Sequence, residues 1–434
     1  MYVSVRLAIA AVCLSVVAAF LPFPVWASLL VVNGVLAVLV AIDVRSAPDA
    51  SALRVRRDVP AVSSSVRTDD VRVELFNPLE RPVEVALRDA APPSLRRTPR
   101  THRVVVPPGS LAVVEAEIRP SRRGYAELGP ITVRTSGILR LAGRQRAVDS
   151  PGRIKVYPPL PGRAHVAQRI ERARALQVGM RSSAFRGGGN EFDSLRDYHP
   201  DDEYRRMDWR ATARAGKPIT KVFREERDQQ MILLLDAGRT MASTLGETSR
   251  FELAIDAGFT LAELGAYVGD RVGMIAFGSR IERMIGPRSG REQPRRILDL
   301  LFDVQPSLEA PDYPRAFATV LGRYRRRALL VLFTELTDER AMQPLLEALP
   351  ALRARHLVVV AAAQDPAVAR SSQRLPADAA GAYAKAAAAE SLASRDRTTA
   401  RLRAMGIGVE DRPPAELAAA VADRYLAIKS AGTL

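Results

Sequence analysis

The stretch QQMILLLDAGRTM, from Gln229 to Met241, decides the fold of the second half of the chain. Its apolar residues form an unbroken run that ends in a carboxylate, Asp236. Such a run is typical of a strand buried on both faces, as in a parallel sheet covered by helices. Because ligands gather at the carboxyl ends of strands in these sheets, Asp236 is the first candidate for a functional residue.

The residues after this stretch alternate between helical and strand patterns. Helices are predicted over 250–269, 291–304, 313–327, an alanine-rich stretch up to 405, and 413–432. Continuous apolar strands are predicted over 270–281, 328–336 and 356–364, with a short last strand over 406–411. The alternation predicts an α/β doubly wound parallel sheet over residues 229–434.

The order of the motifs DAGRTM, FGSRI and LFTEL resembles a von Willebrand factor A-type domain. That family binds a metal through Asp-x-Ser-x-Ser after the first strand, a Thr on a second loop and an Asp after the fourth strand. The resemblance implies a Mg²⁺ or Mn²⁺ site formed by Asp236, Thr240, Asp312 and Glu335. Gly238 replaces the first Ser, which removes one of the roughly six oxygens that Mg²⁺ needs. Capping of helix starts by these acids stays open as the alternative.

Directly upstream, within a segment of residues 159–228, lies RDYHPDDEYRRMDWRATARAGKP. This segment resembles the family catalogued as domain of unknown function fifty-eight. The residues that match the family's pattern are Arg196, Tyr198, Asp202, Arg205, Asp208, Trp209, Ala213 and Arg214. Asp201 stands where the family has a glycine. The resemblance implies a bacterial protein encoded beside MoxR-type AAA+ ATPases, but it implies no reaction.

The same segment has a physical interpretation of its own. Residues 208–215 suit a helix with Asp208 near its start and Gly216 as its C-terminal cap. Trp209 is expected to be a core anchor within this segment.

The basic residues Arg206, Arg210 and Arg214 fall at helical spacing on one face, so they require carboxylate partners. Those partners are either Asp201, Asp202 and Asp208, in a network that locks the segment onto the A-type domain, or an acidic surface of another protein.

Residues 50–158 have a different pattern of apolar and polar residues. Apolar and polar residues alternate over 71–78, 81–89, 102–110, 111–120 and 129–137, with proline, glycine and asparagine between these runs. The pattern predicts an antiparallel, all-β sandwich-like module. Residues 122–130 look like a connection into the last of these strands.

The N-terminal residues 1–44 are predicted to form a two-helix transmembrane hairpin. No charge interrupts residues 7–42, and Pro22 and Pro24 divide them into halves of about the length that crosses a bilayer. Arg6 precedes the first half and Arg45 follows the second, so the positive-inside rule places both ends in the cytoplasm. We therefore expect a multi-pass protein of the inner membrane with its soluble part in the cytoplasm. A cleaved signal peptide is the rival interpretation.

Composition narrows the functional classes. The net charge of +16 with 6% aromatic residues disfavours a nucleic-acid reader and suits an anionic membrane face or an acidic partner. The single cysteine, Cys13, excludes an internal disulfide, and the four histidines lack metal-binding spacing. We expect a non-enzymatic, membrane-anchored adaptor or scaffold whose A-type domain binds protein partners, including a MoxR-type AAA+ ATPase. A metal-dependent hydrolase using the acidic cluster and a binder of anionic surfaces are the alternatives.

Overall fold

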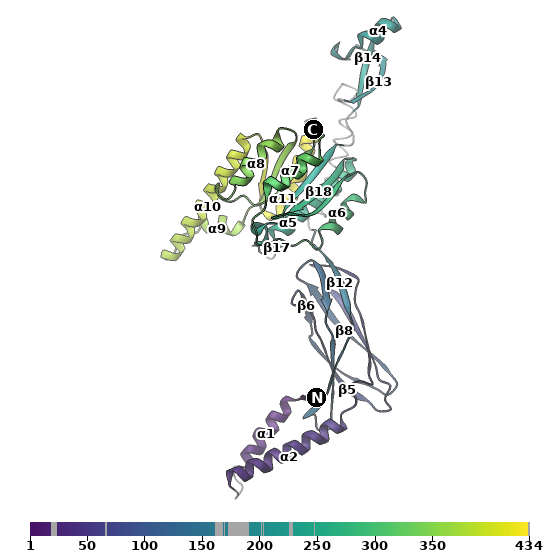
Figure 1. Ribbon diagram of the computed structural model, residues 1–434, viewed down its shortest axis with the longest axis vertical. Coiled ribbons are helices and arrows are strands. Elements are labelled where there is room, and N and C mark those ends of the chain that lie inside the picture. The colour runs from purple at the N-terminus through teal and green to yellow at the C-terminus, as the bar shows by residue number, and fades with distance from the viewer. Residues whose placement is uncertain are drawn as a thin grey trace. The chain divides into compact units, whose positions relative to one another are not determined.

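The computed structural model describes residues 1–18, 24–65, 67–160, 168, 170–171, 191–200, 202, 204–224, 229–246 and 248–432 (Figure 1). The chain divides into two compact units, Met1–Tyr157 and Pro158–Leu434. The predicted hairpin and β module lie in the first unit, and the family segment and the α/β region lie in the second.

The first unit starts with strand β1 (Tyr2–Val3), followed by helices α1 (Val5–Ala18) and α2 (Val25–Ser46). Within the described residues, only α2, over Trp26–Ser46, is long and apolar enough to cross a membrane. Helix α1 starts later than expected because residues 2–3 enter a sheet instead of extending the helix. The structure thus supports one candidate membrane helix near the N-terminus, a property that a signal sequence shares, and does not support two spans.

The β module combines three sheets around one core. Its strands are β2 (Arg54–Asp58), β3 (Val62–Ser64), β4 (Asp69–Phe76), β5 (Val83–Asp89), β6 (Leu95–Thr98), β7 (Thr101–Val106), β8 (Leu111–Pro120), β9 (Gly124–Leu128), β10 (Ile131–Ser136), β11 (Ala142–Val148) and β12 (Gly152–Tyr157). The sheet orders are β1-β11-β10-β5-β7, β2-β4-β8-β6 and β3-β12-β9.

The core of the β module forms because apolar and polar residues alternate along its strands. Val71, Val73 and Leu75 of β4 are buried, while the residues between them are more exposed. Together with apolar residues of the other sheets they form a single cluster, so the predicted all-β module is confirmed. The predicted connection at 122–130 is wrong in part, because it contains strand β9.

The second unit contains a small element that we call the signature module, residues 191–224. Strands β13 (Glu191–Asp197) and β14 (Ile219–Arg224) pair antiparallel. Between them lie the short 3₁₀ helix η2 (Tyr204–Arg206) and helix α4 (Trp209–Ala215).

The rest of this unit is the α/β domain, built on a six-stranded sheet of order β19-β18-β15-β20-β21-β22. Its strands are β15 (Gln230–Asp236), β18 (Arg271–Phe277), β19 (Ile281–Arg288), β20 (Leu329–Phe333), β21 (Leu357–Ala363) and β22 (Gly408–Arg412). All of them run parallel except the edge strand β19. A two-stranded ribbon, β16 (Thr244–Leu245) and β17 (Thr248–Ser249), and the 3₁₀ helix η3 (Arg239–Ala242) follow β15.

Helices cover both faces of this sheet (Figure 1). The helices of this domain are α5 (Arg250–Val268), α6 (Gln293–Leu301), α7 (Tyr313–Arg323), α8 (Gln343–Arg353), α9 (Pro366–Gln373), α10 (Ala379–Ala404) and α11 (Pro414–Ser430), of which α9 buries no residue. Leu233 and Leu235 pack into one core with α5, α6 and α11, whereas Ile232 and Leu234 pack into the other with α7 and α8. The α/β prediction is confirmed, although α8 and β19 were not predicted.

Candidate functional site

The carboxyl edge of the sheet holds Asp236, the last residue of β15, which is fully buried. Its Oδ2 accepts hydrogen bonds from the hydroxyls of Thr334 at 2.6 Å and Tyr313 at 2.9 Å. Its Oδ1 accepts a hydrogen bond from the backbone N–H of Gly238 at 2.7 Å. Burial raises the pKa of Asp236, and these hydrogen bonds partly oppose that rise. The side chain is therefore engaged within its own fold.

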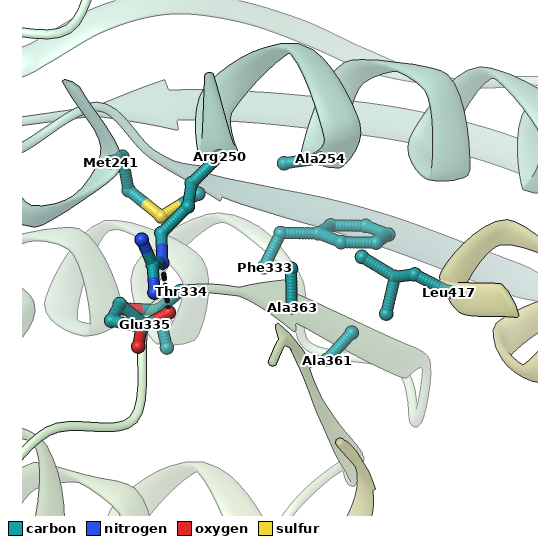
Figure 2. A pocket seen from close by; sticks show the side chains of 9 residues that line it. All are labelled: Met241, Arg250, Ala254, Phe333, Thr334, Glu335, Ala361, Ala363 and Leu417. Atoms are coloured by element: carbon teal, nitrogen blue, oxygen red, sulfur yellow. Dashed lines mark hydrogen bonds and ion pairs between the residues drawn. The ribbon is translucent and has the colours of Figure 1, made fainter. Parts of the chain in front are cut away.

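Glu335, just beyond β20, belongs to a second buried group. Its Oε2 accepts a hydrogen bond from Arg250 Nε at 2.6 Å, drawn as a dashed line in Figure 2, and its Oε1 accepts one from Arg395 Nη1 at 2.6 Å. Arg395 also binds Asp411 through two hydrogen bonds of 2.7 Å. We call Arg250, Glu335, Arg395 and Asp411 the acid–arginine network.

The charge of Arg395 is stabilised by its partners. Burial alone would lower the pKa of Arg395, but hydrogen bonds and attraction from Asp411 and Glu335 raise it above the ordinary value. The guanidinium also donates to the backbone carbonyls of Leu336 at 2.9 Å and Ala363 at 3.2 Å. This pairing explains how two carboxylates remain in a nearly dry environment.

A small pocket lies beside this network (Figure 2). It is lined by Met241, Arg250, Ala254, Phe333, Thr334, Glu335, Ala361, Ala363 and Leu417. Apart from Arg250, Thr334 and Glu335, these side chains are apolar. The pocket has a volume of about 10 Å³, which is room for about one water molecule.

The other two predicted metal ligands have separate positions. Thr240 lies in η3 and is partly exposed, and Asp312 caps helix α7 by accepting a hydrogen bond from Arg315 N at 2.9 Å. For Asp312 the helix-capping alternative is therefore confirmed.

The arrangement does not fit Mg²⁺ or Mn²⁺. Within the described residues, no three histidine, cysteine, aspartate or glutamate side chains form a group that could hold a metal ion. The oxygens of Asp236 and Glu335 already accept hydrogen bonds from hydroxyls, a backbone amide and two arginines. A Cβ atom at Gly238 would lie 2.6 Å from Pro311 Cδ, so this loop has no room for the family's serine without a shift.

The signature module confirms the predicted helix and its caps. Asp208 precedes α4 and accepts hydrogen bonds from Arg210 N at 3.0 Å and Ala211 N at 2.9 Å. Gly216 ends the helix with a φ of 68°, a conformation that glycine adopts readily. The backbone hydrogen bond from Ala211 and the nearby Lys221 lower the pKa of Asp208.

Three ion pairs among the described residues of this module join its own residues. They are Arg196–Asp202 at 2.5 Å, Lys217–Asp197 at 2.9 Å and Lys221–Asp208 at 3.3 Å. The predicted carboxylate partners Asp202 and Asp208 therefore pair with Arg196 and Lys221 rather than with Arg210 or Arg214. Tyr198 joins the two strands, since its N–H donates to the Pro218 carbonyl at 3.0 Å. Asp201 lies outside the described residues.

Trp209 is not the expected core anchor, because its side chain is 58% exposed. Helix α4 instead turns Ala211 inward, at 6% exposure. The indole packs edge-to-face against Tyr204, which is 66% exposed, with ring centroids 5.4 Å apart. Arg205 is exposed next to this pair in the sequence. Exposed aromatic and basic side chains thus gather at one place, which the motif spacing alone did not indicate.

Comparisons with known proteins give one family match in the second unit of the chain. The model of the family described as "Protein of unknown function DUF58" matches residues 194–405, from the signature module through most of the α/β domain. Uncharacterized proteins of Mycobacterium bovis and Mycobacterium tuberculosis are 28% identical over 184 residues, which cover 42% of this chain and 56% of each relative. The chain thus spans about half the length of the curated relatives it matches.

Solved structures give only distant likenesses. One is native alpha-2-macroglobulin from Escherichia coli, solved from domain MG7 to the C-terminus. The match covers 27% of this chain and 17% of the alpha-2-macroglobulin chain, at 18% identity and a TM-score of 0.22. The second is the CARDB domain of a Pyrococcus furiosus protein, solved in complex with di-metal ions. The match covers 26% of this chain and 94% of the CARDB chain, at 16% identity and a TM-score of 0.20. These scores are too low to support an inference about fold or function.

Proposed function

We propose that this protein is a membrane-anchored adaptor or scaffold that binds protein partners and performs no catalysis at its sheet edge. The observation that carries this proposal is the internal pairing of the acids there. A general base or nucleophile must reach its substrate, yet Asp236 is fully buried and Glu335 is bound by two arginines. The adjacent pocket of about 10 Å³ admits about one water molecule and no organic substrate.

The N-terminal contacts support a retained anchor. Strand β1 pairs with β11 of the β module, and Ser4 N donates to the carbonyl of Leu141 at 2.9 Å. Near the end of α2, the buried Asp43 accepts hydrogen bonds from the backbone N–H groups of Leu139, Leu141 and Ala142. The start of α1 and the end of α2 are therefore bound to the same turn between β10 and β11.

The start of α1 and the end of α2 would then lie on one side of a bilayer, which the positive-inside rule takes as the cytoplasm because Arg6 and Arg45 flank the two helices. A protein cleaved as a signal peptide would lack β1 and its pairing with β11. The described part of α1, Val5–Ala18, accounts for about 21 Å of a typical hydrocarbon core of about 30 Å. Residues 19–23 lie outside the described residues. Mass spectrometry of the N-terminal peptide from purified protein tests retention, and a mature chain that begins after residue 23 would refute it.

The α/β domain is the proposed partner-binding domain, with a von Willebrand factor A-like fold. Its strand order, with an antiparallel strand at one edge, supports this likeness. The partner that the family resemblance suggests is a MoxR-type AAA+ ATPase. The family match over residues 194–405 spans both the signature module and this domain, which supports treating the two as one unit in this proposal.

Binding and turnover assays separate the adaptor from the alternative enzyme. Full-length protein in detergent should bind the immobilised MoxR-type ATPase of its own genome saturably. It should release no product from phosphoester or peptide substrates with Mg²⁺ or Mn²⁺. Turnover that disappears in Asp236→Asn would establish the metal-dependent hydrolase instead. Absence of binding to the ATPase and to any other protein would refute the adaptor.

A further inference from the structure

Helix α4 of the signature module has one exposed side. Successive helical residues lie about 100° apart, so Trp209, Arg210, Ala213 and Arg214 project from one side of the helix. All four are exposed, while Ala211 on the opposite side is buried. The helix therefore packs through Ala211 and presents Trp209 and both arginines to solvent.

The aromatic residues of this surface are already paired. Tyr204 and Trp209 meet edge-to-face with an interplanar angle of 70°, although both remain more than half exposed. Leaving apolar area in water costs about 25 cal/mol per Å², so two large exposed rings favour a partner that covers them. Tryptophan, tyrosine and arginine are also the residues that dominate protein–protein binding energies. This composition is therefore typical of a binding surface.

Toward the residues that the structure describes, the arginines of this surface have unused hydrogen-bonding capacity. The guanidinium groups of Arg205 and Arg210 form no hydrogen bond or ion pair with any residue that the structure describes. Arg214 donates to the backbone carbonyl of Arg210 at 3.3 Å. Since a guanidinium binds a carboxylate through two parallel hydrogen bonds, an acidic surface complements these groups.

We propose that Tyr204, Arg205, Trp209, Arg210 and Arg214 form a docking patch for an acidic protein surface, with the aromatic pair at its apolar centre. A nucleic acid or an anionic bilayer presents a continuous negative field. The module carries Asp197, Asp202 and Asp208 among its basic residues, and these carboxylates oppose such a field. A protein with discrete carboxylates can face the arginines and avoid the acids. This inference rests on the proposed adaptor function and specifies the chemistry of the partner.

Site-specific photo-crosslinking in the native membrane tests the patch. A benzophenone amino acid replaces Tyr204 in the full-length chain, and Tyr383 of α10, which is 79% exposed, serves as the control position. We expect crosslinks from position 204 to a protein whose crosslinked peptides are rich in aspartate and glutamate. Crosslinks from position 204 only to a second copy of this chain, to lipid or to nucleic acid would overturn the proposal.

Charge reversal shows whether the arginines bind the partner. The double variant Arg210→Glu and Arg214→Glu should reduce the crosslink yield at position 204 about tenfold or more, since attraction becomes repulsion at two positions. Reversing the mapped acidic residues of the partner to arginine should restore the yield. The matched control reverses Arg325 and Arg326, which are exposed in the α/β domain, and should leave the yield unchanged. Equal yields in both double variants would overturn the proposal.

Crosslinking from positions 204 and 383 also distinguishes failure of the docking patch from failure of the adaptor function. Crosslinks to a partner from position 383 with none from position 204 would overturn the patch and leave the adaptor function standing. Failure to find any protein partner from either position, together with no binding in solution, would overturn both.

Discussion

Replacing Arg395 with methionine is the most direct perturbation of the acid–arginine network. Arg395 is 8% exposed and donates hydrogen bonds to Glu335 and to both oxygens of Asp411. Methionine retains much of the aliphatic volume but removes the charge and all these donors. Glu335 keeps Arg250 at 2.6 Å, whereas Asp411 loses both of its 2.7 Å hydrogen bonds to Arg395.

The expected loss of stability depends on the carboxylates that lose Arg395 as their partner. Breaking a buried ion pair by removing one member costs about 3–5 kcal/mol, because the other charge stays buried. Since Glu335 remains paired, we expect about 3 kcal/mol, at the lower end of this range. For a domain of this size, each 1 kcal/mol corresponds to roughly 2–4 °C, so the melting temperature should fall by about 6–12 °C.

Thermal unfolding of the full-length protein in detergent measures this loss, and hydrogen exchange of peptides from β20, β21 and β22 assigns it to the α/β domain. Arg397→Met is the matched control on the same helix, because Arg397 is exposed and its pair with Glu390 should contribute about 1 kcal/mol or less. Adding Asp411→Asn to Arg395→Met should recover part of the stability, since no unpaired charge then remains at that position. A loss no larger than that of Arg397→Met would refute the reasoning.

Three further predictions concern other parts of the chain. Asp43→Ala should speed hydrogen exchange of the turn between β10 and β11 at least tenfold by mass spectrometry, because one buried and two part-buried backbone N–H groups lose their acceptor. Leaving the buried N–H of Ala142 without an acceptor costs about 1–3 kcal/mol. Unchanged rates would contradict the anchoring role. Asp208 has a folded pKa below its ordinary 3.8, so it stabilises the signature module above that value and the contribution disappears as the pH falls through the lower folded pKa. Trp209 fluorescence in a Trp26→Phe background should report this acid transition, and Asp208→Asn should weaken it; identical profiles would argue against the cap. Mg²⁺ and Mn²⁺ should leave the melting temperature unchanged, and saturable stabilisation that Asp236→Asn abolishes would establish a metal site.

Several features were predictable from sequence because their causes are local. An uninterrupted apolar run before Asp236 is compatible with burial on both faces of a sheet, and the structure has β15 in the middle of such a sheet. The cap pair Asp208 and Gly216 depends on hydrogen bonds and dihedral angles within a single helix, so the residue types alone identified it. The strand β9 was missed because it is short, starts at Gly124 and is followed by Gly129.

The sequence by itself determined the α/β class, the β module and an apolar N-terminal segment, because periodicity and capping act over a few residues. The tertiary structure decided what the acidic and aromatic residues do. Asp236 receives its hydroxyl donors from Tyr313 and Thr334, and Glu335 receives its guanidinium groups from Arg250 and Arg395. Trp209 is exposed because α4 packs through Ala211. These outcomes depend on contacts between residues distant in the chain or on which side of a short helix is covered, and neither leaves a periodic signal in the sequence.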